Sequence, residues 1–371
     1  MWGARKTGKS TFLKEHYPNS IYFDLLKIES YLPIAKDPSI FKEQLLSNSK
    51  ELLKLPIIID EVQKIPILLN EIHWLIENMG MSFILCGSSA RKLKRGAANL
   101  LGGRAWNHYF YPLVYKEIPD FNLLKALNSG LIPSHYLSEN YSKSQKAYIE
   151  NYLKEEIQAE GIVRNLPSFA RFLDSISFSH GQLTNFSNIA RDCGIDSKTV
   201  KEYYQILIDT LLGNFIYPFK ERLGRDIITT APKFYLFDVG IANRLSNKRI
   251  EELRGEDAGK SFEHFILMEI IAYKGIMDKD FEINFWRTKS GHEVDFVLDR
   301  GKIAVEVKIS NQVQKIDLKG LIAFGERNKN SKLYVVSLDK NPRKIIVGNK
   351  STILVLPYKH FLEKLWNGEI L

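Results

Sequence analysis

Apolar and polar positions form two different patterns in the first part of the chain. Ile57–Ile59 and Phe83–Cys86 are continuous apolar runs, whereas Ile67–Met79 carries apolar residues at helical spacing. A short continuous apolar run is typical of a strand that is buried on both faces of a parallel sheet. The pattern therefore predicts a strand–helix–strand unit of an α/β fold. A further helix is expected over Thr11–Tyr17, where Pro18 ends it.

Amphipathic segments dominate the middle of the chain. Residues Tyr148–Glu160 are rich in charge and place their apolar residues on one side, which predicts a helix. Another helix is expected from Phe169 to Ile176, because it follows Pro167 and keeps helical spacing. The middle of the chain is therefore predicted to be mainly helical.

Residues Asn185–Val200 have the spacing of a helix-turn-helix. Ala190 is small where two helices would cross, Gly194 permits a tight turn, and Asp196 or Ser197 would cap the second helix. The exposed face of that second helix offers groups that read DNA bases and phosphates, namely Lys198, Lys201 and Gln205. Acidic neighbours oppose this reading, so a protein–protein spacer stays the alternative to a DNA-binding module.

Two predicted strands near the C-terminus place two carboxylates directly opposite each other. Val294–Leu298 and Ile303–Ile309 flank Arg300-Gly301, a pair that favours a turn. Pairing around this turn makes paired residue numbers sum to 601, which places Asp295 opposite Glu306. The alternation of side chains in a strand puts Lys308 on the same face as Glu306. Because like charges are unfavourable at paired positions, a divalent cation between the carboxylates would explain them.

The first residues carry the pattern of a phosphate-binding P-loop, G-x-x-x-x-G-K-[ST]. Its backbone N–H groups would surround the phosphates of ATP, Lys9 would reach the β- and γ-phosphates, and Ser10 would ligate Mg²⁺. The expected nucleotide-binding residues are Gly3, Ala4, Arg5, Lys6, Thr7, Gly8, Lys9, Ser10 and Thr11.

Carboxylates follow the first predicted strand and would complete this nucleotide site. Asp60 would hold Mg²⁺ through water, and Glu61 would polarise the attacking water. The next strand delivers Ser88 or Ser89 to the same edge, where a hydroxyl would contact the γ-phosphate or the lytic water. Taken alone, the acidic pair is equally typical of a solvated strand end; the P-loop upstream favours the catalytic reading.

One element of the expected site is missing from the pattern. A P-loop ordinarily follows a buried apolar strand, but only Met1 and Trp2 precede Gly3. We therefore expect a parallel sheet without its first strand, caused either by a start codon placed too far downstream or by decay of the site.

Together these residues resemble the prokaryotic AAA-family (AAA+) ATPases that end in a domain of unknown function, 4143. Beside the P-loop and Asp60-Glu61, the stretches that carry the resemblance are Gly87–Leu93, Leu101–Arg104, Pro112-Leu113 with Glu117, Leu236–Gly240, Glu293–Asp295 and Glu306–Lys308. The resemblance implies an AAA+ P-loop ATPase domain over residues 1–120, a helical linker over 121–180, a winged helix-turn-helix over 181–225 and a nuclease-like domain over 226–371.

The resemblance also implies roles for several single residues. Arg104 lies where the family has a Gly-Arg pair and would meet phosphate within the chain or from a neighbouring copy; an ordinary surface arginine is the alternative. Asp295, Glu306 and Lys308 are similar to the PD-(D/E)xK nuclease signature, in which carboxylates hold Mg²⁺ and the lysine positions or activates water. Glu263 matches the extra metal-binding carboxylate of such folds. A lysine that merely neutralises the pair, or a relic site, is the alternative.

The composition of the chain is compatible with several kinds of partner and identifies none of them. The net charge of +9 permits DNA without requiring it, and the two cysteines, Cys86 and Cys193, favour a reducing cytoplasm. We find neither an apolar run that would cross a membrane nor a signal peptide. The sequence thus indicates an ATP- and Mg²⁺-dependent enzyme that controls a nuclease-like domain, with DNA and further copies of the chain as candidate partners. One alternative is a nucleotide switch that binds DNA or a protein partner through the winged-helix and C-terminal modules and cuts nothing. A decayed protein is the other.

Overall fold

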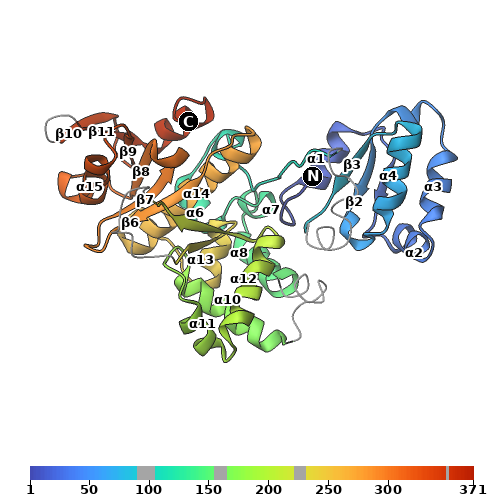
Figure 1. Cartoon of the computed structure of the whole chain (residues 1–371), viewed down its shortest axis with the longest axis horizontal. Helices are drawn as coiled ribbons and strands as arrows, with labels where there is room; N and C mark the ends of the chain where they lie inside the picture. Colours follow the sequence, from blue (N-terminus) through green and yellow to red (C-terminus); the bar gives the residue numbers. More distant parts are fainter. Residues whose placement is uncertain (90–104, 154–164, 221–230, 348–350) are drawn as a thin grey trace. The chain divides into compact units, whose positions relative to one another are not determined.

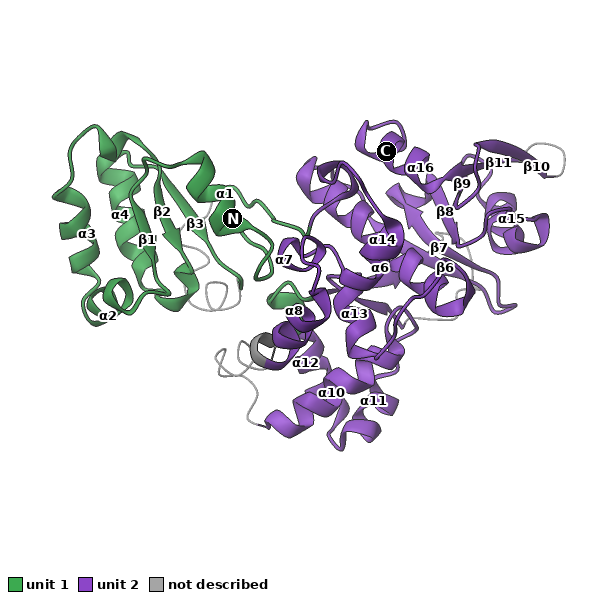
Figure 2. Ribbon diagram, turned by 180° about the vertical axis from the view of Figure 1, so that it is seen from behind, with its two compact units in different colours: residues 1–112, 206–212 green, residues 113–205, 213–371 purple. Residues whose placement is uncertain are grey.

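The structure is a computed structural model that describes residues 1–89, 105–153, 165–220, 231–347 and 351–371. It divides into two compact units, which are coloured separately in Figure 2. Unit 1 contains Met1–Pro112 together with Ile206–Leu212, and unit 2 contains Leu113–Gln205 together with Gly213–Leu371. Each unit combines helices with its own β-sheet, as the predicted α/β fold class requires.

Unit 1 is built on a parallel three-stranded sheet in the order β1-β2-β3. Its strands are β1 (Tyr22–Asp24), β2 (Ile57–Asp60) and β3 (Phe83–Cys86). Its helices are α1 (Lys9–His16), α2 (Ile28–Lys36), α3 (Ser39–Leu46) and α4 (Leu68–Met79). The two strands and the α4 helix expected from the apolar pattern are all confirmed, as is the helix after the P-loop.

Alternate side chains of β2 pack on opposite faces of this sheet. Ile57 and Ile59 lie in a core with buried residues of α2, α3 and α4, while Ile58 packs with Leu13 of α1 on the other face. All three isoleucines have no exposed surface. Burial on both faces explains why β2 reads as a continuous apolar run.

The chain's first residues lie beside β3 as a short extension of the sheet. Trp2 forms parallel bridges with Gly87 on one side and with Tyr109 on the other. The amide of Gly87 donates to the carbonyl of Met1, and the amide of Phe110 donates to the carbonyl of Trp2. The P-loop therefore leaves the sheet from the position where the expected first strand would end.

Unit 2 has an eight-stranded mixed sheet in the order β10-β11-β9-β8-β7-β6-β4-β5. Its strands are β4 (Gly213–Pro218), β5 (Lys233–Leu236), β6 (Ile283–Arg287), β7 (Glu293–Leu298), β8 (Ile303–Lys308), β9 (Lys332–Ser337), β10 (Arg343–Val347) and β11 (Ser351–Pro357). Phe296 pairs with Val305 and Leu298 with Ile303, so the predicted register of β7 and β8 is confirmed. The pairing of β4 with β6 carries the sheet across residue 225, the boundary expected from the sequence.

Helices accompany this sheet, and several of them pack against its strands (Figure 1). They are α6 (Leu123–Ser129), α7 (Pro133–Tyr136), α8 (Tyr141–Ala147), α10 (Leu166–Ser179), α11 (Phe186–Cys193), α12 (Ser197–Asp209), α13 (Val239–Leu245), α14 (Gly255–Ile276), α15 (Lys319–Arg327) and α16 (Tyr358–Trp366). A π-helical segment, Tyr148–Leu153, begins where the amphipathic helix was expected; the rest of that prediction lies outside the described residues.

The predicted helix-turn-helix is formed by α11 and α12. Asn185 caps α11 by accepting from the amides of Ser187 and Asn188, and Asp196 accepts from the amides of Lys198 and Thr199 at the start of α12. Gly194 ends α11 in the left-handed conformation, with φ of 64°. Glycine adopts the left-handed conformation at little energetic cost, which explains why a glycine occupies this turn.

The Leu236–Gly240 stretch has a structural task. Asp238 caps α13 by accepting from the amide of Ile241 at 2.9 Å, and it also accepts from the amide of Leu131 at 2.6 Å. A Cβ atom on Gly240 would lie 2.2 Å from the amide nitrogen of Gly130, so only glycine lets α13 approach this closely. This segment therefore joins α13 to the end of α6.

Candidate functional site

The P-loop forms a tight turn directly before α1. Lys6 and Gly8 have φ of 62° and 96°, and α1 starts directly afterwards at Lys9. The Lys9 ammonium lies inside the loop, where it donates to the carbonyls of Gly3 at 2.6 Å and Ala4 at 2.8 Å. An ammonium in this position lies where a P-loop would bind the phosphates of a nucleotide.

Asp60 lies at the end of the central strand, β2, directly beside the P-loop. Its Oδ2 atom accepts hydrogen bonds from Ser10 Oγ and Tyr22 Oη, both at 2.6 Å. Its Oδ1 atom is buried and has no hydrogen-bond partner among the residues the structure describes. An ionised carboxylate that is bonded on one oxygen only offers the other to a cation or its water, so the site fits Mg²⁺.

The surroundings keep the groups near Asp60 protonated. Burial raises the pKa of Tyr22, and the neighbouring Asp60 carboxylate adds to this effect, so the phenol remains a hydrogen-bond donor. Burial, followed by the same carboxylate, likewise raises the pKa of the Cys86 thiol. Tyr22 and Cys86 therefore stay protonated beside Asp60.

Glu61 is held by side chains from two elements. Gln63 Nε2 donates to Glu61 Oε2, and Ser88 Oγ donates to the same oxygen at 3.2 Å. Glu61 itself adopts a left-handed backbone conformation, with φ of 60°, that few non-glycine residues take. The structure thus brings together Glu61 and Ser88, as expected if both act on the lytic water, and adds Gln63.

Some of these residues escaped the sequence pattern. Tyr22 belongs to β1, a strand of three residues that overlaps the short apolar run Ile21–Phe23, and such a run is too short to indicate a strand. Gln63 follows Glu61 by two positions, a spacing that signals no chemistry by itself. Arg104 lies outside the described residues, so its role in phosphate contact stays a prediction.

The second candidate site is a carboxylate cluster in unit 2, formed by Glu263, Glu293, Asp295 and Glu306 with Lys233 and Lys308. The amide of Val307 donates to Asp295 Oδ2 at 2.8 Å, which ties β7 to β8 at this point. Lys308 Nζ lies 2.7 Å from Glu306 Oε1. Glu306 Oε2 is buried without a partner in the described part of the chain.

Burial dominates the electrostatics of the paired strands. It raises the pKa of Asp295 well above the ordinary value, and the carboxylates of Glu306 and Glu263 raise it further. Burial also raises the pKa of Glu306, against the effect of Lys308. Burial opposes the charge of Lys308, but Glu306 and Asp295 outweigh it and raise the pKa of its ammonium. Lys308 is therefore a cation that can position water or phosphate rather than a base.

Glu263 enters the cluster from the long helix α14. Tyr235 Oη donates to Glu263 Oε1 at 2.5 Å, and Lys233 Nζ lies 3.8 Å from the same oxygen. Within the described residues, no three His, Cys, Asp or Glu side chains form a group that could hold one ion. Asp295 and Glu306 alone, completed by water, are still a ligand set that suits Mg²⁺, since this ion commonly binds one or two carboxylates.

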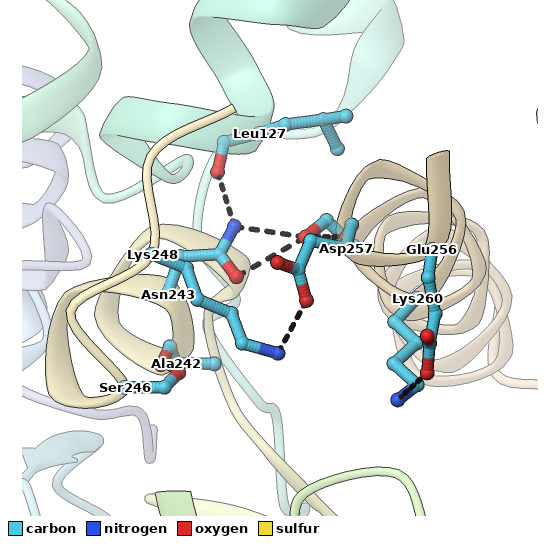
Figure 3. Close-up of polar contacts among 9 residues, drawn as sticks. Leu127, Ala242, Asn243, Ser246, Lys248, Glu256, Asp257 and Lys260 are labelled. Atoms are coloured by element: carbon cyan, nitrogen blue, oxygen red, sulfur yellow. Dashed lines mark hydrogen bonds and ion pairs between the residues drawn. The ribbon is translucent and has the colours of Figure 1, made fainter. Parts of the chain in front are cut away.

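Polar contacts at the start of α14 fix the helix that carries Glu263 (Figure 3). Asn243 Nδ2 donates to the carbonyl of Leu127 and to Ser261 Oγ, both at 2.9 Å. Lys248 pairs with Asp257 at 2.7 Å. These contacts join α6, α13 and α14, so the position of Glu263 relative to the sheet is determined by neutral and charged contacts away from the cluster.

Three regions of the chain match known protein families. Residues 1–119 match a family model described as an AAA domain, and residues 258–361 match a domain of unknown function, DUF4143. Residues 121–252 match another domain of unknown function, DUF8612. The N-terminal region is thus an ATPase-like P-loop domain of the AAA kind, followed by two regions whose family descriptions name no activity.

Two curated relatives are similar to part of the chain. They are uncharacterized proteins of Mycobacterium bovis and Mycobacterium tuberculosis, each 25% identical over 250 residues. The similarity covers 66% of this chain but 56% of each relative, so the chain spans about half the length of the curated relatives it matches. No solved structure matches the chain. None of the helices in the described ranges has the length and apolar composition needed to cross a membrane.

Proposed function

We propose that the chain binds ATP together with Mg²⁺ and hydrolyses the nucleotide at the P-loop. The observation that carries this proposal is the contact of Ser10 and Tyr22 with one oxygen of Asp60, while the other oxygen is buried without a partner among the described residues. Lys9 would bind the phosphates, and Ser10 and Asp60 would hold Mg²⁺, which neutralises phosphate charge. Glu61 would orient the attacking water.

Exchange of Glu61 for glutamine separates binding from hydrolysis. We expect Glu61→Gln to lower the rate of phosphate release by about 100-fold or more, because the amide cannot polarise water, while the affinity for a fluorescent ATP analogue is unchanged. Glu51→Gln, at an exposed position of the same unit, is the control. Equal losses of binding and hydrolysis would show that Glu61 has no separate role in the chemical step.

The carboxylate cluster supports a second part of the proposal, a Mg²⁺-dependent nuclease-like activity that ATP hydrolysis controls. Asp295 and Glu306 lie on paired strands, and the buried Glu306 Oε2 offers an oxygen to a metal ion. Lys308 supplies a cation beside them. The alternative is a nucleotide switch that cuts nothing; the ion pair between Lys308 and Glu306 favours it, because charge at the cluster is already partly balanced.

Plasmid nicking with Mg²⁺ or Mn²⁺ distinguishes the two versions. The nuclease-like version predicts metal-dependent nicking that Asp295→Asn abolishes, since the amide, unlike the carboxyl group, cannot lose a proton to bind the ion. If DNA stimulates ATP hydrolysis but no nicking occurs, the switch accounts for the data. Nicking that survives Asp295→Asn would have to come from another protein.

The helix-turn-helix is the proposed DNA contact. Lys198, Lys201 and Gln205 are exposed on α12, where a recognition helix would need them. Lys198→Ala with Lys201→Ala should weaken binding of duplex DNA, measured by fluorescence anisotropy, and reduce its salt dependence. Unchanged anisotropy would favour a protein–protein role for this segment.

Arg104 is proposed to contact phosphate from its own or a neighbouring copy of the chain. Arg104→Ala should then lower the ATPase rate more than the affinity for ATP, because an arginine of this kind stabilises charge that develops during phosphoryl transfer. Equal losses in both quantities would argue against this role.

A further inference from the structure

Lys233 places a buried positive charge inside the carboxylate cluster. It is the first residue of β5, and only 5% of its surface is exposed. Its ammonium lies 2.6 Å from Glu293 Oε1 and 3.8 Å from Glu263 Oε1. It also lies over the ring of Phe285, at 5.2 Å from the centroid. A lysine is rarely buried unless its charge is paired, so these carboxylates are its counter-ions.

Two of the four carboxylates are already satisfied by protein groups. Glu263 Oε1 receives the hydroxyl of Tyr235 in addition to Lys233. Glu293 contacts Lys233 through Oε1, and its Oε2 lies 3.4 Å from Arg287 Nη1. A metal ion bound between Glu263 and Glu293 would have to displace the ammonium, because the two cations would repel at this distance.

The other two carboxylates are arranged differently. Asp295 Oδ2 accepts from the amide of Val307, a neutral donor, and Glu306 Oε2 is buried without a partner among the described residues. Lys308 contacts the other oxygen of Glu306. Oxygen atoms suited to a divalent cation therefore lie on the Asp295–Glu306 side of the cluster and not on the Glu263–Glu293 side.

We propose that Lys233 is a built-in cation that takes the place of a second metal ion, so that the cluster binds one divalent ion, on Asp295 and Glu306. The inference rests on the proposed metal-dependent function of this cluster and specifies how many ions it uses. Glu263 is then a counter-ion and positioning residue instead of a metal ligand. Lys233 acts through Glu263 and Glu293 and is itself a positioning residue.

Titration with Mn²⁺ counts the ions directly, without any need for activity. Isothermal titration calorimetry is carried out on the nucleotide-free full chain, with Asp60→Asn in every sample so that the P-loop contributes no site. We expect one Mn²⁺ ion per chain, none after Asp295→Asn, and two after Lys233→Met, because Glu263 and Glu293 then lack their counter-ion. Lys332→Met is the matched control, since Lys332 also begins a strand of this sheet but is exposed; it should bind one ion.

The possible results separate the inference from the function on which it rests. Two ions before any change at Lys233, or one ion both before and after it, would overturn the role of Lys233 and leave the metal site intact. No bound ion in the unchanged cluster would overturn the metal-dependent function itself. If Lys233→Met does not fold, Lys233→Gln keeps a hydrogen-bond donor beside Glu293 and should bind two ions; one ion in that variant would likewise overturn the role of Lys233.

Discussion

Asp60 and Glu306 are both nearly buried carboxylates at strand positions, but their partners differ. Asp60 accepts from the neutral hydroxyls of Ser10 and Tyr22, whereas Glu306 is paired with the ammonium of Lys308. Each keeps one buried oxygen without a partner in the described chain. Neutral donors leave the negative charge of Asp60 for an incoming cation, while Lys308 already balances much of the charge of Glu306.

The lysines of the two sites also differ in the charge of their hydrogen-bond partners. Lys9 donates to the carbonyls of Gly3 and Ala4 inside the P-loop. Lys308 is bound to a carboxylate of its own site. The carboxylate cluster is thus largely balanced internally, whereas Asp60 Oδ2 accepts from the neutral hydroxyls of Ser10 and Tyr22. We conclude that nucleotide chemistry is the better supported of the two activities.

The largest expected effect tests the nucleotide side of this comparison. Lys9→Ala removes the cation that would bind the phosphates, and we expect affinity for ATP to fall by about 100-fold or more. Equilibrium binding of a fluorescent ATP analogue measures it. Lys36→Ala, at an exposed position of α2, should leave affinity unchanged. If Lys9→Ala bound ATP as tightly as the unchanged chain does, the proposal that the P-loop binds ATP would be wrong.

The next effect tests the balance at the cluster. Lys308→Met leaves Glu306 without its cation and should lower the free energy of unfolding by on the order of 2 kcal/mol, since the lysine is partly exposed. Added Mn²⁺ should recover more of the melting temperature in this variant than in the unchanged chain. A melting temperature that responds neither to the substitution nor to Mn²⁺ would show that the pair balances no significant charge.

A third carboxylate shows what burial does without any lysine. Among the residues that the structure describes, Glu269 accepts from the amide of Tyr115 and the indole of Trp366, and burial raises its pKa from 4.5 to about 7. The folded state then binds a proton more strongly than the unfolded state. The contribution of Glu269 to stability is therefore largest below about pH 4.5 and declines as pH rises towards about 7.

Thermal unfolding with and without Glu269 measures this decline. Between pH 5 and pH 7 the melting temperature of the unchanged chain should fall by a few degrees relative to that of Glu269→Gln, whose amide does not titrate. The contributions of all other titrating groups to the melting temperature are the same in both chains and cancel in the difference. A parallel pH dependence of the two melting temperatures would therefore show that Glu269 is not protonated in the folded state.

The smallest effect concerns Tyr22. Tyr22→Phe removes one of the two hydroxyls on Asp60 and should weaken Mg²⁺-dependent ATP binding by about three- to tenfold, the net contribution of one typical hydrogen bond. Binding of ATP in the presence of EDTA should not change. A loss of the same size with and without Mg²⁺ would indicate that Tyr22 supports the fold of the P-loop and not the metal position.

The sequence predicted those parts of the molecule that depend on neighbouring residues. The apolar run of β2, the helical spacing of α4 and the register of β7 and β8 follow from local spacing, and all three are confirmed. The sites of Asp60, Glu61 and Glu306 follow from the ends or faces of these elements. Their chemical roles stay predictions.

Partners that are distant in sequence could not be predicted in this way. Tyr22 reaches Asp60 through the pairing of β1 with β2, and Lys233 reaches Glu293 through the order of strands in the large sheet. No local pattern gives strand order, because it depends on packing of the complete unit. The mixed sheet, which continues from the helix-turn-helix into the carboxylate hairpin, escaped prediction for the same reason.

This shared sheet limits how the molecule can be recombined. A gene fusion that exchanged everything before residue 225 would replace β4 while keeping β6, its neighbour, and β5, its antiparallel partner. Inheritance of the helix-turn-helix with the carboxylate hairpin as one piece is therefore the arrangement that preserves folding. Homologues that carry a different N-terminal ATPase are compatible with this constraint, whereas homologues that exchange only the helix-turn-helix are not.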